Sequence, residues 1–306
     1  MTLPIEGPFS LHDEEAYAKW RDYKRARFPV NVDALKVEVK DLSRPSDVEI
    51  KAIGDRIRRS GMAIYQSKVV SNVEEAKILV RRFGENFGLK HLDRNPYADD
   101  DAISHLHDAS QGAGKLYIPY TTRALNWHTD GYYNPQHRLI RSMILHCVEP
   151  ATCGGENFMF DPEMAYILMR EADLCMLKAL FKDDAMTIPT NDVDEKIERH
   201  DINGPVFSVS HGINELHMRY TARRRHVKWA KDAHTSKAVD FLSTMLGENS
   251  TVPDFKFSYH LNPGEGLVCR NVLHGRTAFE NMKNDDNQGH RMMLRARYLD
   301  PIDVSL

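Results

Sequence analysis

Hydrophobic positions recur at helical spacing in the first third of the chain. Residues 13–27 are highly charged and are expected to form a helix. Two capping-box patterns each predict the start of a further helix: Ser46 with Glu49, and Ser71 with Glu74. The first of these two helices is expected to end at Gly61, because glycine readily adopts the left-handed backbone that closes a helix. The pattern therefore predicts a mostly helical part over residues 1–85.

Beyond about residue 85, short apolar runs and alternating apolar positions replace the helical spacing. Strands are expected over 139–148, 206–210, 216–220, 255–261, 266–269 and 291–299. Asp161 followed by Pro162 is typical of a helix start, so we expect a helical insertion over about residues 161–182. Many strands with one such insertion favour a β-sandwich or jelly roll, which encloses a site between its sheets.

The absence of repeats and long linkers predicts one domain over residues 1–306, mainly β with flanking helices. Its jelly-roll core is expected over residues 86–306. With 42% hydrophobic and 28% charged residues, the composition is that of an ordinary globular protein. A formal net charge of −3 argues against a general binder of polyanions.

Sequence features also bear on the compartment. The chain has no run of about 18 apolar residues that could cross a membrane, and its N-terminus lacks the pattern of a secretory signal. The four cysteines are scattered without a C-x-x-C pair, which indicates free thiols in a reducing compartment. We therefore expect a cytoplasmic protein with no membrane partner.

A candidate metal site begins in the segment Asn126-Trp127-His128-Thr129-Asp130-Gly131. One residue separates His128 from Asp130, so both side chains would share a face if this segment is a strand. A third ligand could come from His274, in Val272-Leu273-His274-Gly275. Two imidazoles and one carboxylate on one side of a metal leave positions open for substrate and dioxygen, as in non-haem Fe(II) oxygenases.

An isolated H-x-D pattern is weak, and a second one, His91-Leu92-Asp93, is expected to lie in a loop. The motif at His128 gains weight from Thr152-Cys153-Gly154-Gly155-Glu156-Asn157. Its two glycines permit either a simple hairpin turn or a close backbone approach beside a ligand. Asn157 would then enter a strand with its amide placed to hydrogen-bond a bound carboxylate.

The last expected strand has strictly alternating side chains. Met292, Leu294, Ala296 and Tyr298 fall on one face, and Arg291, Arg295 and Arg297 fall on the other. One interpretation is an edge strand with a solvated basic face. The other is an anion receptor, since a guanidinium grips a carboxylate through two hydrogen bonds and stays charged.

In this order, W-H-T-D-G, G-G-E-N, N-V-L-H-G and R-x-x-x-R resemble the TauD/TfdA (taurine dioxygenase) family of Fe(II)- and 2-oxoglutarate-dependent oxygenases, over about residues 115–300. The resemblance implies a double-stranded β-helix (jelly roll) that binds Fe(II) through His128, Asp130 and His274. It also implies that Arg291 pairs with the distal carboxylate of 2-oxoglutarate, and that Arg295 faces the co-substrate or the substrate.

The family usually has threonine where this chain has Asn157, whose amide can make a similar hydrogen bond. The spacing from His274 to Arg291 is longer than is common, so an insertion around 281–289 is expected to loop out. The implied reaction consumes 2-oxoglutarate and O2, hydroxylates a C–H bond and releases succinate and CO2. Related halogenating enzymes replace the carboxylate ligand with a small residue, so Asp130 favours hydroxylation.

Two groups of residues bear on the substrate. Aromatic side chains surround the metal motif in sequence and could line the core or cage a quaternary ammonium group: Tyr117, Tyr120, Trp127, Tyr132 and Tyr133. The segment 217–226, which carries Arg219 and Arg223, resembles the substrate-side segment of butyrobetaine-hydroxylase-like members. It could recognise a small anion or be a solvated basic loop. We expect a small anionic or zwitterionic metabolite as substrate.

Two alternatives remain open. Arg291 and Arg297 form an R-x5-R pattern reminiscent of nucleic-acid-directed oxygenases, although the acidic net charge argues against nucleic acid as a partner. The second alternative is a non-catalytic metal-binding jelly-roll protein, which would have no reason for Arg291. Members of the resembled family are frequently dimers or tetramers, so a homo-oligomer is possible.

Overall fold

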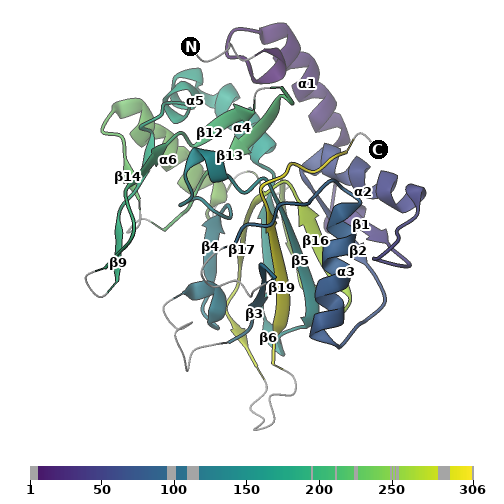
Figure 1. The fold of residues 1–306 in the computed structure, drawn as a ribbon. Helices are drawn as coiled ribbons and strands as arrows, with labels where there is room; N and C mark the ends of the chain where they lie inside the picture. Colours follow the sequence, from purple (N-terminus) through teal and green to yellow (C-terminus); the bar gives the residue numbers. More distant parts are fainter. Residues whose placement is uncertain are drawn as a thin grey trace. The chain divides into compact units, whose positions relative to one another are not determined.

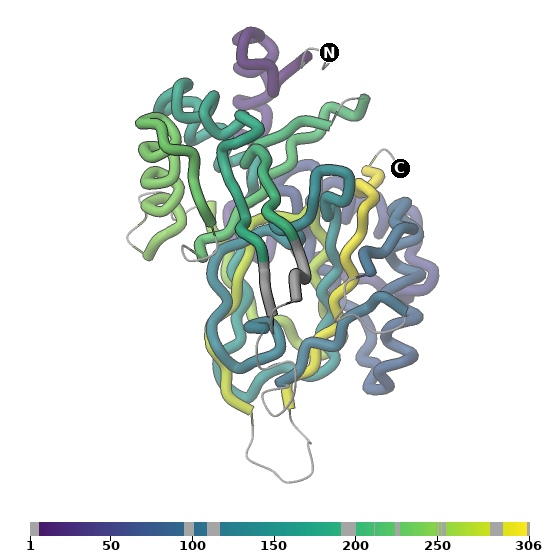
Figure 2. The backbone as a smooth tube through the Cα atoms, turned by 60° about the vertical axis from the view of Figure 1, so that its left-hand side comes forward, coloured from purple at the N-terminus to yellow at the C-terminus, as the bar shows by residue number. Residues whose placement is uncertain are grey.

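The computed structural model describes residues 6–94, 101–108, 117–193, 196–210, 212–223, 227–248, 250, 252, 255–281 and 290–304. The chain divides into two compact units, and its course is traced in Figure 1 and Figure 2. Unit 1 comprises Met1–Phe28, Trp127–Leu139 and Phe160–Lys256, and unit 2 comprises Pro29–Asn126, Ile140–Met159 and Phe257–Leu306. Each unit is therefore assembled from segments that are far apart in the sequence.

Unit 2 contains a six-stranded sheet in which only the first pair of neighbouring strands is parallel. In spatial order the strands are β1 (Lys36–Glu38), β2 (Met62–Gln66), β16 (Glu265–Cys269), β5 (Ser142–Glu149), β19 (Met292–Tyr298) and β3 (Ile103–Leu106). The predicted last strand, β19, is therefore an internal strand between β5 and β3. The solvated edge strand considered for it is wrong.

A four-stranded sheet carries several of the residues that the sequence singles out. Its order is β15 (Lys256–Tyr259), β7 (Asn157–Phe160), β17 (Leu273–Arg276) and β4 (Leu125–His128). The short strands β6 (Cys153–Gly154) and β18 (Phe279–Glu280) pair with each other. The turn at Pro263-Gly264 thus connects β15 in one sheet to β16 in another, and does not close a hairpin.

Two helices, α2 (Asp47–Ser60) and α3 (Val73–Glu85), lie along the six-stranded sheet (Figure 1). The predicted capping box of α2 is present, and Gly61 ends the helix at a φ of 73°. The predicted start of α3 is wrong by one residue: Asn72 is the N-cap, and its side-chain oxygen accepts a hydrogen bond from the Glu75 N–H. Asparagine caps helices as well as serine does, so both pairs were plausible starts.

Unit 1 is richer in helix. Its helices are α1 (Glu14–Arg27), α4 (Pro162–Ala172), α5 (Leu174–Leu180) and α6 (Ala233–Leu246). Its strands are β8 (Met186–Ile188), β9 (Asn191–Val193), β10 (Lys196–Arg199), β11 (Ile202–Gly204), β12 (Phe207–Ser210), β13 (Glu215–Met218) and β14 (Lys228–Trp229). Short 3-10 helices in the two units are η1 (Gly7–Phe9), η2 (Val32–Leu35), η4 (Ile118–Tyr120) and η5 (Gln136–Arg138). The helix predicted to begin at Asp161-Pro162 is confirmed as α4.

Asp161 also anchors α1 to α4. Besides capping α4 through the Glu163 N–H, its carboxylate lies 2.7 Å from the Lys24 ammonium, and both side chains are buried. A buried charge is tolerated when it is paired in this way. None of the described helices has the length and hydrophobicity needed to span a bilayer.

A buried polar pair in unit 2 makes folding sensitive to acid. The Tyr65 hydroxyl lies 3.0 Å from His146 Nδ1 in the core. Burial lowers the pKa of His146 from 6.5 to about 4. Between these two pH values the unfolded chain binds a proton at this ring that the folded chain does not. Stability is therefore complete above pH 6.5 and is lost as the pH falls toward 4.

We expect protonation of His146 to lower the free energy of unfolding by about 3 kcal/mol when the pH falls from neutral to below about 4. In urea titrations from about pH 4 to 7, His146→Gln should show a shallower pH dependence, because its amide can accept the Tyr65 hydrogen bond but does not titrate. His137→Gln, at an exposed histidine, is the control and should follow the wild type. An unchanged slope in His146→Gln would contradict this assignment.

Candidate active site

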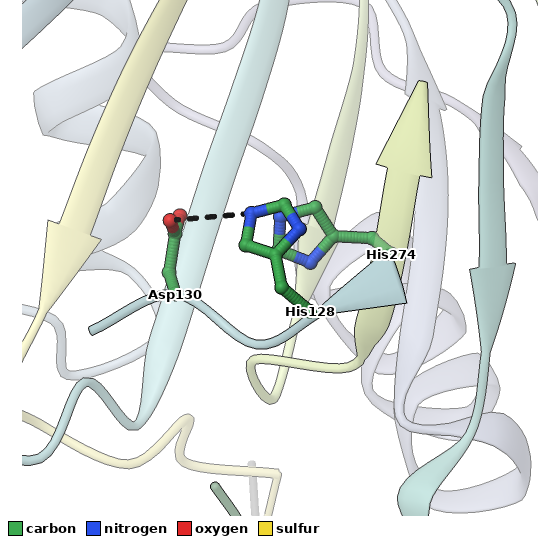
Figure 3. A group of neighbouring side chains, drawn as sticks. All are labelled: His128, Asp130 and His274. Atoms are coloured by element: carbon green, nitrogen blue, oxygen red, sulfur yellow. Dashed lines mark ion pairs between the residues drawn. The ribbon is translucent and has the colours of Figure 1, made fainter. Parts of the chain in front are cut away.

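Strand β4 ends at His128, and Asp130 lies beyond it. The argument that strand alternation places the two side chains on one face is therefore wrong. Thr129 follows the strand: its N–H donates to the Tyr220 carbonyl at 3.0 Å and its Oγ1 accepts from the Tyr220 N–H at 3.1 Å. The turn begins at Asp130. His128 Nε2 and Asp130 Oδ1 lie 4.0 Å apart, and both side chains are buried (Figure 3).

His274 lies on β17 with its ring orientation fixed by the backbone. Its Nδ1 is 2.8 Å from the Val272 carbonyl oxygen, which can only accept, so we assign the proton to Nδ1. This tautomer leaves the Nε2 lone pair for a metal. One ligand atom from each of His128, Asp130 and His274 lies within 4.8 Å of the others. Figure 3 shows the three side chains as one group. The donor set fits a non-haem Fe(II) ion.

Unit 2 contains a pocket around His274 that has an unusual share of arginine. Its lining comprises Leu106, Pro119, Leu125, Met143, Leu145, Asn157, His274, Gly275, Arg276, Arg291 and Arg295. Asn157, Arg291 and Arg295 were predicted for the co-substrate, and all three are buried. Burial lowers the pKa of Arg291 to about 10, because the charged form loses its hydration. The pocket is therefore suited to an anion.

The two glycines of the G-G-E-N segment both have left-handed backbones, with φ of 71° for Gly154 and 81° for Gly155. A Cβ on Gly154 would lie 2.1 Å from the Ala278 carbonyl oxygen, and one on Gly155 would lie 3.6 Å from Arg291 Nε. The hairpin turn considered from the sequence is wrong, because β6 pairs with β18 and the flanking strands β5 and β7 belong to different sheets. The close approach of the backbone at Gly154 is to the Ala278 carbonyl oxygen, and Gly155 lies beside Arg291.

Arg297, unlike Arg291 and Arg295, is not among the residues that line the pocket. Its guanidinium forms a buried ion pair with Asp93. Asp93 belongs to the second H-x-D pattern, whose histidine, His91, lies with Nδ1 2.7 Å from Asp300 Oδ1. Arg297 is therefore buried and paired, which argues against a contact between this arginine and nucleic acid.

The aromatic residues predicted for the substrate differ in how close they lie to the predicted metal ligands. The Tyr132 ring lies 6.4 Å from the His128 ring and 5.2 Å from the Tyr133 ring, centroid to centroid. Trp127 is half-buried. In unit 2, Tyr120 is buried. Tyr132 is thus the aromatic side chain placed beside a predicted metal ligand.

Arg219 is not solvated, so the solvated basic loop considered from the sequence is wrong at this residue. Its side chain is buried, with Nε donating to the Tyr132 carbonyl at 2.7 Å. Its Nη2 donates to the carbonyls of Met186 at 3.2 Å and Ile202 at 2.9 Å. These bonds favour a structural role. Arg223 is half-buried, and residues 224–226 lie outside the described residues, as do residues 282–289 of the expected insertion.

The sequence interpretation missed Arg276. This residue is 4% exposed, lines the pocket and lies two positions after His274 on β17. The period of two along a strand puts Arg276 on the same face as His274, and this spacing could have revealed it. Its Nη2 donates to the carbonyls of Thr121 at 2.9 Å and Arg123 at 2.5 Å.

Comparison with known proteins adds family information to this geometry. A model of the family described as "Taurine catabolism dioxygenase TauD, TfdA family" matches residues 26–297. A uridine-5'-phosphate dioxygenase of Amycolatopsis sp is 32% identical over 188 residues, which is 58% of this chain and 62% of that protein. One of Streptomyces sp is 27% identical over 270 residues, which is 84% of this chain and 90% of that protein.

Solved structures share the fold at low sequence identity. The non-heme iron oxygenase OrfP has a TM-score of 0.60 at 12% identity, covering 84% of this chain and 82% of its own. The PvcB protein of Pseudomonas aeruginosa has a TM-score of 0.55 at 13% identity, covering 87% of this chain and 86% of its own.

Proposed function

The chain belongs to the TauD/TfdA family of taurine catabolism dioxygenases, and on this premise we propose that it uses Fe(II), 2-oxoglutarate and O2 to hydroxylate a C–H bond of a small anionic metabolite. Succinate and CO2 would be the co-products. The observation that carries the proposal is the grouping of two buried imidazoles and one carboxylate, with one imidazole facing a pocket lined by arginines.

One group of residues would bind the metal, and another would bind the co-substrate. His128, Asp130 and His274 would hold Fe(II), which, when bound, supplies the oxidising chemistry with 2-oxoglutarate and O2. Arg291 and Asn157 would bind the distal carboxylate of 2-oxoglutarate, with Arg295 serving the co-substrate or the substrate. Their burial excludes water, which strengthens each charge-assisted hydrogen bond.

We further propose that the six-stranded and four-stranded sheets correspond to the two sheets of a double-stranded β-helix. This architecture would explain why β5 and β19 of the six-stranded sheet and β7 and β17 of the four-stranded sheet all present residues to one pocket. A passive metal-binding protein of the same fold would have no use for buried arginines there.

A nucleoside monophosphate, with uridine 5'-phosphate first, is the substrate that we propose to test. The support is the name of the two curated relatives, one of which aligns with 84% of this chain. Uridine 5'-phosphate is an anion, so of the two substrate types considered from the sequence, this support favours the anionic one. Tyr132, beside His128, is the side chain that we expect to contact it.

Succinate release should be measured with Fe(II), 2-oxoglutarate and O2 in the presence of uridine 5'-phosphate, uridine, other nucleoside monophosphates, taurine, amino acids and betaines. We expect uridine 5'-phosphate to raise succinate release on the order of tenfold or more above the substrate-free rate, with an oxidised product detected by mass spectrometry. Uridine, which lacks the phosphate, is the matched control and should act weakly. Turnover only with a zwitterion would reject the nucleotide and retain the oxygenase.

A further inference from the structure

Two guanidinium groups, those of Arg276 and Arg291, are buried in one pocket of unit 2 without an acidic partner among the described residues. Each side chain is only 4% exposed. Placing two like charges in a site with little water is unfavourable unless an anion compensates them. The positive charge of these two arginines is therefore not compensated by the described side chains around them.

One aromatic ring brings the two guanidiniums together. The Cζ atom of Arg276 lies 4.4 Å from the centroid of the Phe279 ring, and that of Arg291 lies 5.1 Å from the same centroid. The charge of Arg291 also contributes, after burial, to lowering the pKa of Arg276 to about 9. Both observations place the two groups beside the same ring of one pocket.

Arg276 is held rigidly but retains capacity to bind. Its Nη2 is committed to the carbonyls of Thr121 and Arg123. Its Nε is buried and has no hydrogen-bond partner within the described part of the chain. A side chain fixed by the backbone at one end loses little further entropy when it binds a ligand.

We propose that Arg276 acts with Arg291 as a second guanidinium for the distal carboxylate of 2-oxoglutarate, so that the pocket selects a 2-oxo acid with a second acid group. This inference rests on the proposed function and extends it to co-substrate selection. A carboxylate near both guanidiniums relieves their repulsion and replaces the hydration that burial removed. An uncharged end of the co-substrate would do neither.

The test compares two 2-oxo acids that differ only at that end. 2-Oxoglutarate and 2-oxopentanoate are titrated into the anaerobic Fe(II) protein, and binding is followed by the visible charge-transfer band of the chelate. In Arg276→Met, affinity for 2-oxoglutarate should fall about 10- to 100-fold, as for the loss of a charge-assisted hydrogen bond, and affinity for 2-oxopentanoate should stay within about twofold. Arg44→Met, which removes an exposed arginine of unit 2 that does not line the pocket, should match the wild type.

Other outcomes overturn the inference in distinguishable ways. Unchanged affinity for 2-oxoglutarate in Arg276→Met would exclude contact with the carboxylate, and an equal loss for both acids would assign Arg276 a purely structural role. If Arg276→Met does not fold, Arg276→Lys decides: the ratio of the two affinities must fall, because lysine lacks the planar fork. Absence of any band in the wild type would instead reject the proposed function itself.

Discussion

Replacing His128 with alanine is expected to abolish the charge-transfer band that Fe(II) and 2-oxoglutarate produce without oxygen. Succinate release should fall on the order of a thousandfold. The physical reason is that the proposed site has only three protein ligands, and two of them do not hold Fe(II) in the geometry that chelates a 2-oxo acid. Absorption spectroscopy and metal analysis of the purified variant measure both effects.

His137→Ala is the matched control, since this histidine lies nearby in the sequence but is exposed. It should keep the band and the turnover of the wild type. A His128→Ala protein that retained stoichiometric Fe(II) and the full band would contradict the assigned ligand set.

Adding one methyl group at Gly275 is expected to have the second large effect. A Cβ there would lie 2.1 Å from the Phe158 ring and 2.4 Å from the Leu125 carbonyl oxygen, and the backbone oxygen cannot move without disturbing β4. We expect Gly275→Ala to lower the free energy of unfolding by about 3 kcal/mol or more. Because Gly275 lines the arginine pocket, 2-oxoglutarate should also bind more weakly.

Gly54→Ala provides the comparison for urea denaturation. Gly54 lies inside α2, where the nearest atom to an added Cβ is 3.6 Å away, an ordinary contact. This change should leave the protein as stable or stabilise it by up to about 1 kcal/mol, since alanine favours helix. Equal destabilisation by the two substitutions would show that close packing at Gly275 is not the cause.

The sequence predicted residue types better than it predicted how the backbone presents them. His128, Asp130 and His274 were chosen from their spacing, and their ligand atoms do converge in the structure. The reason given for the first two was wrong, because β4 stops at His128 and the next residue, Thr129, is hydrogen-bonded to Tyr220. A local sequence pattern cannot show where the pairing between two strands that are distant in sequence ends.

The arginines show the same limit. Alternation along the expected strand 291–299 put Arg291, Arg295 and Arg297 on one face, but it could not reveal that Asp93 pairs with Arg297. The segment of Arg219 was interpreted as either an anion-binding segment or a solvated basic loop, whereas the Arg219 side chain donates to distant backbone carbonyls. Whether an arginine can bind a ligand depends on the neighbours that the tertiary structure places around it. Those neighbours are distant in sequence, so a local pattern cannot identify them.

The hydrogen bond from His274 Nδ1 to the Val272 carbonyl has a consequence for metal exchange. Because this contact is made entirely within the chain, the imidazole points its lone pair in the required direction before any ion arrives. Redox-inert divalent ions of similar size should then occupy the same place without side-chain rearrangement. An enzyme substituted in this way would hold 2-oxoglutarate and the substrate without reacting. The complex of protein, co-substrate and substrate could therefore be trapped in crystals exposed to air.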